Sequence, residues 1–219
     1  MLAFLLIGCA DPDPFADTLC SLYAPFDVQG WTRSYEPVAG GDFGEEGWRT
    51  VTTVGPEDFE GSSAFLVEDS FEADYPTTDV YRIDFRMAFV CDEQGTWLRG
   101  WTGHRHDEDG DQVFDQDSSL VLDQPLLWMP GQPSGSWSDT VSGVYTLDGQ
   151  SYDVEWVHEA ERLEEGSVDT AGGSFEGLRI ERRMGTQDSM TETLEWWTER
   201  EGEVLREEQW SFREREVAG

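Results

Sequence analysis

The densest group of residues that could do chemistry lies between positions 104 and 117. His104 and His106 are two residues apart, so in a β-strand both imidazoles point to the same face. Two imidazoles and a carboxylate can hold Zn²⁺ or Cu²⁺, and acidic residues follow directly. The candidate metal ligands are therefore His104, His106, Asp107, Asp109, Asp111 and Asp115. The alternative is two exposed histidines that lead into a solvated acidic hairpin.

The same acidic run partly matches a calcium-binding loop. Counted from Asp107, the residues Asp109 and Asp111 fall at the third and fifth ligand positions, and Asp115 falls at the ninth. The glycine at the sixth position and the final bidentate glutamate are both missing. Calcium at a non-standard site is thus the one cofactor that the sequence suggests, and otherwise we expect none.

Catalytic machinery is not indicated. The sequence has no Gly-x-Ser-x-Gly nucleophile elbow, and its spacing pairs no serine with a histidine. Acidic residues are too abundant for spacing to identify a glycosidase pair. We expect no catalytic residues.

Two tryptophans are candidate ligand contacts. Trp196 and Trp197 are adjacent, so in a strand they point in opposite directions, and an exposed Trp197 flanked by glutamates could stack on a sugar ring. Trp128 lies in the apolar stretch from Pro125 to Pro133, which we expect to be a loop that plugs the sheet or covers a cavity. The alternative for each tryptophan is a place in the core.

The N-terminus resembles a bacterial lipoprotein signal. An apolar run from Leu2 ends in small Gly8 directly before Cys9, the layout of a lipobox whose cysteine accepts diacylglycerol. The run is too short to span a bilayer. No basic residue precedes it, which suggests that the true start lies upstream.

Lipidation of Cys9 leaves two of the three cysteines, Cys20 and Cys91, and we expect a disulfide between them. Exported compartments permit such bonds. Two free buried thiols are the alternative. The Asp13-Pro14 pair, followed by spaced apolar residues, predicts a short capped helix that carries Cys20.

The chain is strongly acidic. Its 219 residues include 47 acidic and 14 basic side chains, for a formal net charge of -33. This surplus argues against a nucleic-acid partner, whose binding depends on cationic side chains. Apolar residues make up 37% of the chain and 10 are tryptophan, so a real core can be buried. We expect one domain with a well-solvated surface.

Alternating apolar and polar residues predict β-strands. In the stretch from Val80 to Cys91, every second residue from Tyr81 onward falls on one face, and this face is apolar and ends at Cys91. Arg82 and Arg86 fall on the other face. Turns are marked by five glycine-containing pairs: Asp148-Gly149, Gln94-Gly95, Asp109-Gly110, Glu165-Gly166 and Glu201-Gly202. We expect an all-β fold of roughly 9 to 11 antiparallel strands, a single curved meander that is half-barrel or barrel-like, with at most a short N-terminal helix.

The C-terminal third carries a further pattern. Its matching residues are Val168, Thr170, Gly173, Phe175, Leu178 and Ile180. This stretch resembles a hairpin of the TapB-like family, exported bacterial β proteins of unknown function, and the segments from Leu194 and Gly202 are similar to the final strand pair of that family. Ala171 stands where the family has proline, and Val204 where it has a second glycine. The resemblance implies a β fold and supplies no catalytic residues.

The expected organisation is a signal peptide over 1–8, a lipid anchor and tether over 9–14, and one β domain over 15–219. We expect the protein in the cell envelope, at the outer membrane, with a membrane as partner through lipid on Cys9. The favoured role is a non-enzymatic structural or assembly lipoprotein. A carrier for an apolar ligand or a glycan in the curved sheet is the alternative, and a hydrolytic enzyme is the third reading.

Overall fold

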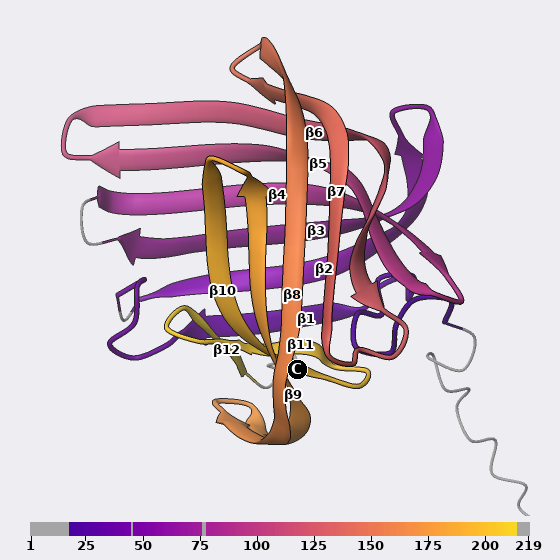
Figure 1. Ribbon diagram of the computed structural model, residues 1–219. Helices are drawn as coiled ribbons and strands as arrows, with labels where there is room; N and C mark the ends of the chain where they lie inside the picture. Colours follow the sequence, from indigo (N-terminus) through magenta and orange to yellow (C-terminus); the bar gives the residue numbers. More distant parts are fainter. Residues whose placement is uncertain (1–17, 45, 76–77, 214–219) are drawn as a thin grey trace, which may run out of the picture.

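The structure, a computed structural model, describes residues 18–44, 46–75 and 78–213. These residues form twelve strands and no helix. Each strand pairs antiparallel with its sequence neighbours and β1 pairs with β12, so the sheet closes into a barrel (Figure 1). The strands are β1 (Thr32–Pro37), β2 (Gly47–Phe59), β3 (Ser62–Tyr75), β4 (Thr78–Asp92), β5 (Gly95–Asp109), β6 (Gln112–Pro130), β7 (Ser136–Leu147), β8 (Gln150–Thr170), β9 (Gly173–Thr186), β10 (Ser189–Thr198), β11 (Gly202–Arg206) and β12 (Trp210–Arg213). The prediction of an all-β fold is confirmed. Of the expected half-barrel or barrel-like forms, the structure shows the closed barrel, with one strand more than the upper expected number.

Strand β4 shows how alternation builds the barrel. Tyr81, Met87 and Phe89 pack into the main core, whereas Arg82 and Arg86 are exposed on the outer face. Successive strand residues point to opposite faces, so one phase fills the barrel and the other meets water. The predicted strand and its inward face are confirmed.

The turns follow the predicted chemistry with one exception. Asp148 and Gly149 have φ values of 47° and 78°, so both residues adopt the left-handed conformation that a two-residue hairpin between β7 and β8 requires. A turn at Glu165-Gly166 was the wrong expectation, because β8 continues to Thr170 and Gly166 pairs with Gly177 on β9. Pairing with a long partner strand keeps this glycine extended.

The apolar stretch from Pro125 to Pro133 was expected to be a loop, but its residues up to Pro130 belong to a strand. Strand β6 runs to Pro130, and its residues Leu126 and Met129 are buried. The register between β5 and β6 shifts between Leu98 and Gly100, so Pro125 falls in an irregularity where no ladder hydrogen bond is required of it. The strand therefore passes through the proline.

The barrel wall divides where β6 leaves β7. These strands pair only over Ser118–Leu122 and Gly143–Leu147. Beyond that point side chains replace the ladder: Asp139 accepts a hydrogen bond from the Leu127 amide at 3.0 Å, and Trp137 Nε1 donates to the Trp128 carbonyl at 3.3 Å. In Figure 1, β2–β6 run across the view and β7–β10 run nearly at right angles to them. The divergence holds the two halves of the barrel apart.

The segment ahead of β1 forms turns and contains no helix from residue 18 onward. The Asp27 carboxylate accepts hydrogen bonds from the amides of Leu19 and Cys20, which captures backbone donors that a helix would use. The predicted short helix is thus wrong over its described part. The Cys20–Cys91 disulfide is confirmed, and it ties this segment to the end of β4.

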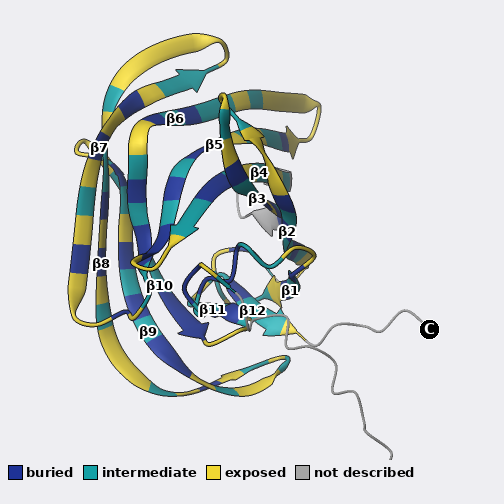
Figure 2. Cartoon of the chain, turned by 90° about the vertical axis from the view of Figure 1, so that its right-hand side faces the viewer, coloured by how far each residue is buried: buried dark blue, intermediate teal, exposed yellow. Residues whose placement is uncertain are grey.

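This segment, residues 18–31, closes one end of the barrel. Phe26 packs on Phe89 with ring centroids 4.5 Å apart, and the Ser21 amide donates to Thr96 Oγ1 at 3.2 Å. Trp31 Nε1 donates to the carbonyl of Arg200, in the turn after β10, at 3.2 Å. The segment therefore touches opposite sides of the wall, and in the end-on view of Figure 2 it lies across the interior.

Residues 1–17 lie outside the described residues, and with them the expected signal peptide, Cys9 and its tether. Lipidation of Cys9 stays a prediction. Among the residues that the structure describes, none belongs to a helix long and apolar enough to cross a membrane.

Candidate functional site: a cavity inside the barrel

A cavity of about 460 Å³ lies inside the barrel. Its apolar wall comes from strands β1 to β10 and from the N-terminal segment: Phe26, Trp31, Tyr35, Val51, Phe71, Phe85, Met87, Trp101, Trp128, Tyr145, Trp156, Met184 and Trp197. Ligand pockets in proteins commonly enclose on the order of 300–1,000 Å³ and are mostly apolar with a few polar groups. The cavity has the size and lining of such a pocket.

An aromatic cluster forms one side of the cavity. Trp101 on β5 lies edge-on to Phe85, Tyr145 and Trp156, with ring centroids 5.4, 6.0 and 6.4 Å away. All four rings point inward yet are only partly buried, because they face open space. In a filled barrel, inward aromatic rings would be buried against one another.

A glycine makes room for this cluster. Gly103 pairs directly with Phe85 across β4 and β5, and a Cβ at Gly103 would lie 2.8 Å from the Phe85 ring. A side chain at this position would push the ring into the cavity. The absent side chain therefore keeps the wall flat.

The two ends of the cavity differ. Phe26 and Trp31 of the N-terminal segment form the buried end. Thr186, Ser189 and Thr191, around the hairpin between β9 and β10, also line the cavity, and the latter two are exposed. The cavity thus opens to solvent past hydroxyl groups.

Charged side chains in the wall form a buried network. Arg49 on β2 donates two hydrogen bonds of 2.9 Å to Asp69 on β3 and a third to Glu203 on β11. Arg206 donates to the other oxygen of Glu203 at 2.7 Å. The Tyr35 hydroxyl donates to the backbone carbonyl of Glu203 at 2.9 Å, and burial raises the pKa of Tyr35. Each buried charge in this group has an opposite partner, as the interior requires.

A second group continues the network behind the wall. Arg182 Nε donates to Glu195 at 3.0 Å, and its Nη1 donates to the Trp128 carbonyl at 3.1 Å and to His158 Nε2 at 2.5 Å. The guanidinium lies 4.3 Å from the centre of the Trp128 ring, on which the His158 ring stacks. Trp197 Nε1 donates to Glu195 at 2.7 Å. The network therefore fixes two tryptophans of the cavity wall.

Burial and neighbouring charges set the protonation of this group. Burial alone disfavours the charged carboxylate, but the Arg182 and Arg206 guanidiniums hold the pKa of Glu195 below its usual value. Burial, with Arg182 as the second cause, lowers the pKa of His158 to about 3. Glu195 is therefore an anion at neutral pH, and His158 is neutral and accepts at Nε2 because a guanidinium only donates.

The structure places both predicted ligand-contacting tryptophans, Trp128 and Trp197, in the wall of this cavity. Trp196 and Trp197 point in opposite directions as expected, but both are buried. Trp196 packs in a separate small cluster with Val168 and Val204. The expectation of an exposed, sugar-stacking tryptophan is thus wrong for this pair. Trp197 lies in the main core, and Trp196 is covered by its small cluster on the other face.

His104 and His106 share the outer face of the β5–β6 hairpin. His104 Nδ1 lies 2.9 Å from Asp117, and His106 contacts Asp115 at 2.6 Å and Glu108 at 3.1 Å. Hydrogen bonds to these two carboxylates raise the pKa of His106. The geometry is that of exposed imidazole–carboxylate pairs.

Of the other predicted metal ligands, Asp115 lies beside both histidines, whereas Asp107, Asp109 and Asp111 are not gathered with them. Asp107 is buried on the opposite face, where it pairs with Arg105. Asp109 ends β5 and Asp111 lies in the two-residue turn, so the expected calcium-binding stretch is two paired strands and not a loop.

Within the described ranges, one cluster of three side chains presents closely spaced metal-ligating atoms: Cys20, Asp27 and Cys91. Both of its sulfur atoms are joined in the disulfide, so neither is a free thiolate that could bind a metal.

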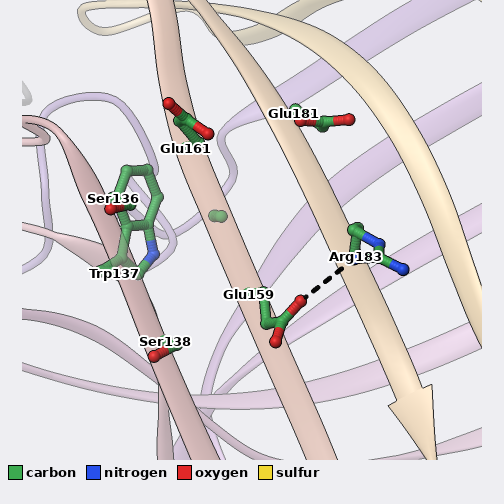
Figure 3. Close-up of a pocket in the computed structure, with 8 residues that line it drawn as sticks. Ser136, Trp137, Ser138, Glu159, Glu161, Glu181 and Arg183 are labelled. Carbon is green, nitrogen blue, oxygen red and sulfur yellow. Dashed lines mark hydrogen bonds and ion pairs between the residues drawn. The ribbon is translucent and has the colours of Figure 1, made fainter. Parts of the chain in front are cut away.

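A shallower groove of about 370 Å³ lies on the outside of β7–β9 (Figure 3). Its charged side chains include Glu159, which pairs with Arg183 at 3.4 Å, and Glu161. The Trp137 ring at its floor is only 9% exposed, so it offers little surface for stacking. The groove lacks the apolar wall of the interior cavity.

Sequence reasoning missed the charged network, although its members carry a signal. Arg182 is in phase with Ile180 and Met184 on the inward face of β9, and Arg49 is in phase with Val51 on β2. A charge in the apolar phase of a strand must be paired inside. Such positions could have been selected from the alternation alone.

Comparison of the chain with protein-family models, curated proteins and solved structures finds no match. The resemblance to the TapB-like family stays a prediction.

Proposed function

We propose that the protein is a carrier or receptor that binds a small, mainly apolar molecule inside the barrel. The observation that carries this proposal is the open cavity of about 460 Å³ walled by aromatic rings that remain partly exposed. Empty apolar space forfeits packing contacts, so a protein that only needed stability would fill it. We prefer this role to the structural one that the sequence favours, because a structural barrel gains nothing from a hollow core.

We propose the cell envelope as the place where the carrier acts. The lipobox-like layout before Cys9 supports this location. The Cys20–Cys91 disulfide also supports it, because such bonds persist in oxidising compartments.

The test is titration of the purified chain with N-phenyl-1-naphthylamine, an uncharged apolar dye whose fluorescence rises in apolar surroundings. We expect saturable binding of one dye per chain. Thr191 pairs across the strands with inward-facing Met184 at the mouth, so Thr191→Trp should block entry. We expect this variant to weaken dye binding at least about tenfold, which corresponds to roughly 1.4 kcal/mol.

The neighbouring residue supplies a matched control. Glu192 is exposed, pairs with Arg183 and points to the outer face, so Glu192→Trp adds the same bulk outside the barrel. This control should leave dye binding unchanged. Absence of saturable binding, or equal effects of the two variants, would refute the cavity as the binding site.

A further inference from the structure

The aromatic cluster of the cavity wall consists of Trp101 and its three neighbours Phe85, Tyr145 and Trp156. The planes of these neighbours are inclined by 82°, 62° and 69° to the Trp101 plane. In an edge-to-face pair of rings, the corner between them is bounded by a face of each. All four rings line the cavity and remain partly exposed. A molecule inside the cavity can therefore meet ring faces, which carry the negative part of the aromatic quadrupole.

Other rings of the same wall already hold cations. The Arg182 guanidinium lies 4.3 Å from the centre of the Trp128 ring and 5.7 Å from that of Trp197. The Arg49 guanidinium lies 4.8 Å from the centre of the Tyr35 ring. Among the residues that the structure describes, none of the contacts between a guanidinium and a ring involves the aromatic cluster. The faces of this cluster are thus left for a cation that comes from outside the chain.

The charges of the wall do not suit an anion. Four charged side chains line the cavity, and Arg49 and Arg206 are paired there with Asp69 and Glu203. Both cations of the lining are therefore engaged, and a buried anion would lack compensation. The whole chain carries a formal net charge of -33, whose field attracts cations and repels anions.

From these observations we infer the class of ligand, an inference that rests on the proposed function. The ligand is a mainly apolar organic cation, and its quaternary ammonium group lies against the rings of the aromatic cluster. Such a group has no N–H that burial could leave unpaired, so ring faces can replace part of its hydration. The apolar remainder of the ligand packs on the rest of the wall.

The inference is tested with three compounds of similar size: phenyltrimethylammonium, its uncharged isostere tert-butylbenzene, and the anion benzenesulfonate. Each is titrated against the dye-loaded protein at neutral pH, and its dissociation constant is taken from displacement of the dye. Physiological ionic strength is used, because it screens exposed charges beyond about 8 Å. We expect the cation to bind about three- to tenfold more tightly than the hydrocarbon, in the range of a partly desolvated cation–π contact. The anion should bind most weakly.

Two variants separate the attraction of the ring faces from packing. Trp101→Leu keeps an apolar side chain but removes the central ring, so it should lower the preference for the cation at least about threefold while the hydrocarbon still binds. Met87 pairs directly with Trp101 and also lines the cavity, so Met87→Leu is the matched control. It should change both affinities together and leave their ratio unchanged. Retained hydrocarbon binding shows that each variant is folded. Should Trp101→Leu destroy binding of all compounds, Trp156→Leu provides the same comparison.

The outcomes distinguish the inference from the function on which it rests. Cation binding no tighter than that of the hydrocarbon overturns the inference, and so does a cation preference that the tryptophan variant leaves intact. In both cases dye binding would still support the carrier. Failure of the dye and of all three compounds to bind would overturn the carrier itself.

Discussion

We expect the contributions of Arg182 and Glu195, which form a buried ion pair, to the free energy of unfolding to be strongly coupled to each other. Its atoms are 3.0 Å apart, and the two side chains are 3% and 2% exposed. Removing one partner of a buried pair leaves an uncompensated charge and costs about 3–5 kcal/mol. We therefore expect this loss of unfolding free energy from Arg182→Met and from Glu195→Met.

The double variant should lose far less than the sum. It removes one charge of each sign, and the group formed by Arg49, Asp69, Glu203 and Arg206 stays balanced. We expect a coupling energy of about 2–3 kcal/mol. The assay is urea unfolding at about pH 8, where His158 is neutral in the folded and unfolded chain alike. The denaturant slopes of all variants are compared to confirm a common unfolding transition.

A pair on the outer face with a similar N–O distance serves as the control. Arg82 and Asp84 lie 2.9 Å apart, but their side chains are 46% and 33% exposed. Solvent screening limits such pairs to about 0–1 kcal/mol. Additive losses in the buried pair, or equal coupling in the two pairs, would refute the claim that burial makes the inner network essential.

Three further predictions concern pH and redox state. The lowered pKa of His158, about 3, means that the unfolded chain binds the proton first. Stability should then fall by up to about 1.4 kcal/mol per pH unit below about pH 6.5, and His158→Gln should flatten this slope in urea titrations. The raised pKa of His106 acts with the opposite sign: its stabilisation is full at low pH and is lost as pH rises through the folded-state value, so His106→Gln should weaken the protein more at low pH than at high pH. The Cys20–Cys91 disulfide closes a loop of 71 residues, so Cys20→Ser with Cys91→Ser should cost about 4 kcal/mol in thermal unfolding and make stability insensitive to reductant. An unchanged melting temperature in that variant would count against the loop-closure argument.

Several elements follow from local patterns. The alternation from Tyr81 to Cys91 identifies β4 and its inward face, and Asp148-Gly149 identifies a hairpin. These succeed because side-chain direction in a strand has a period of two and because tight turns need particular backbone angles. The disulfide followed from cysteine arithmetic.

Other features depend on partners far away in the chain. Residues 125–130 look like a proline-bounded loop, yet pairing with β5 makes them strand. The expected helix around Cys20 is replaced by turns that Asp27 holds and that seal the barrel. Local preference decides neither case, because tertiary hydrogen bonds outweigh it.

The sequence by itself determined the all-β class, the alternating faces, the acidic surface and the cysteine pair. Only the tertiary structure decided that the meander closes, that a cavity remains inside, and that Arg49, Arg182 and Glu195 meet their partners there. The physical reason is that alternation tells which side chains point inward but not how far apart the opposing walls stand. That distance depends on how the two halves of the barrel diverge at β6 and β7, a property of pairing between strands.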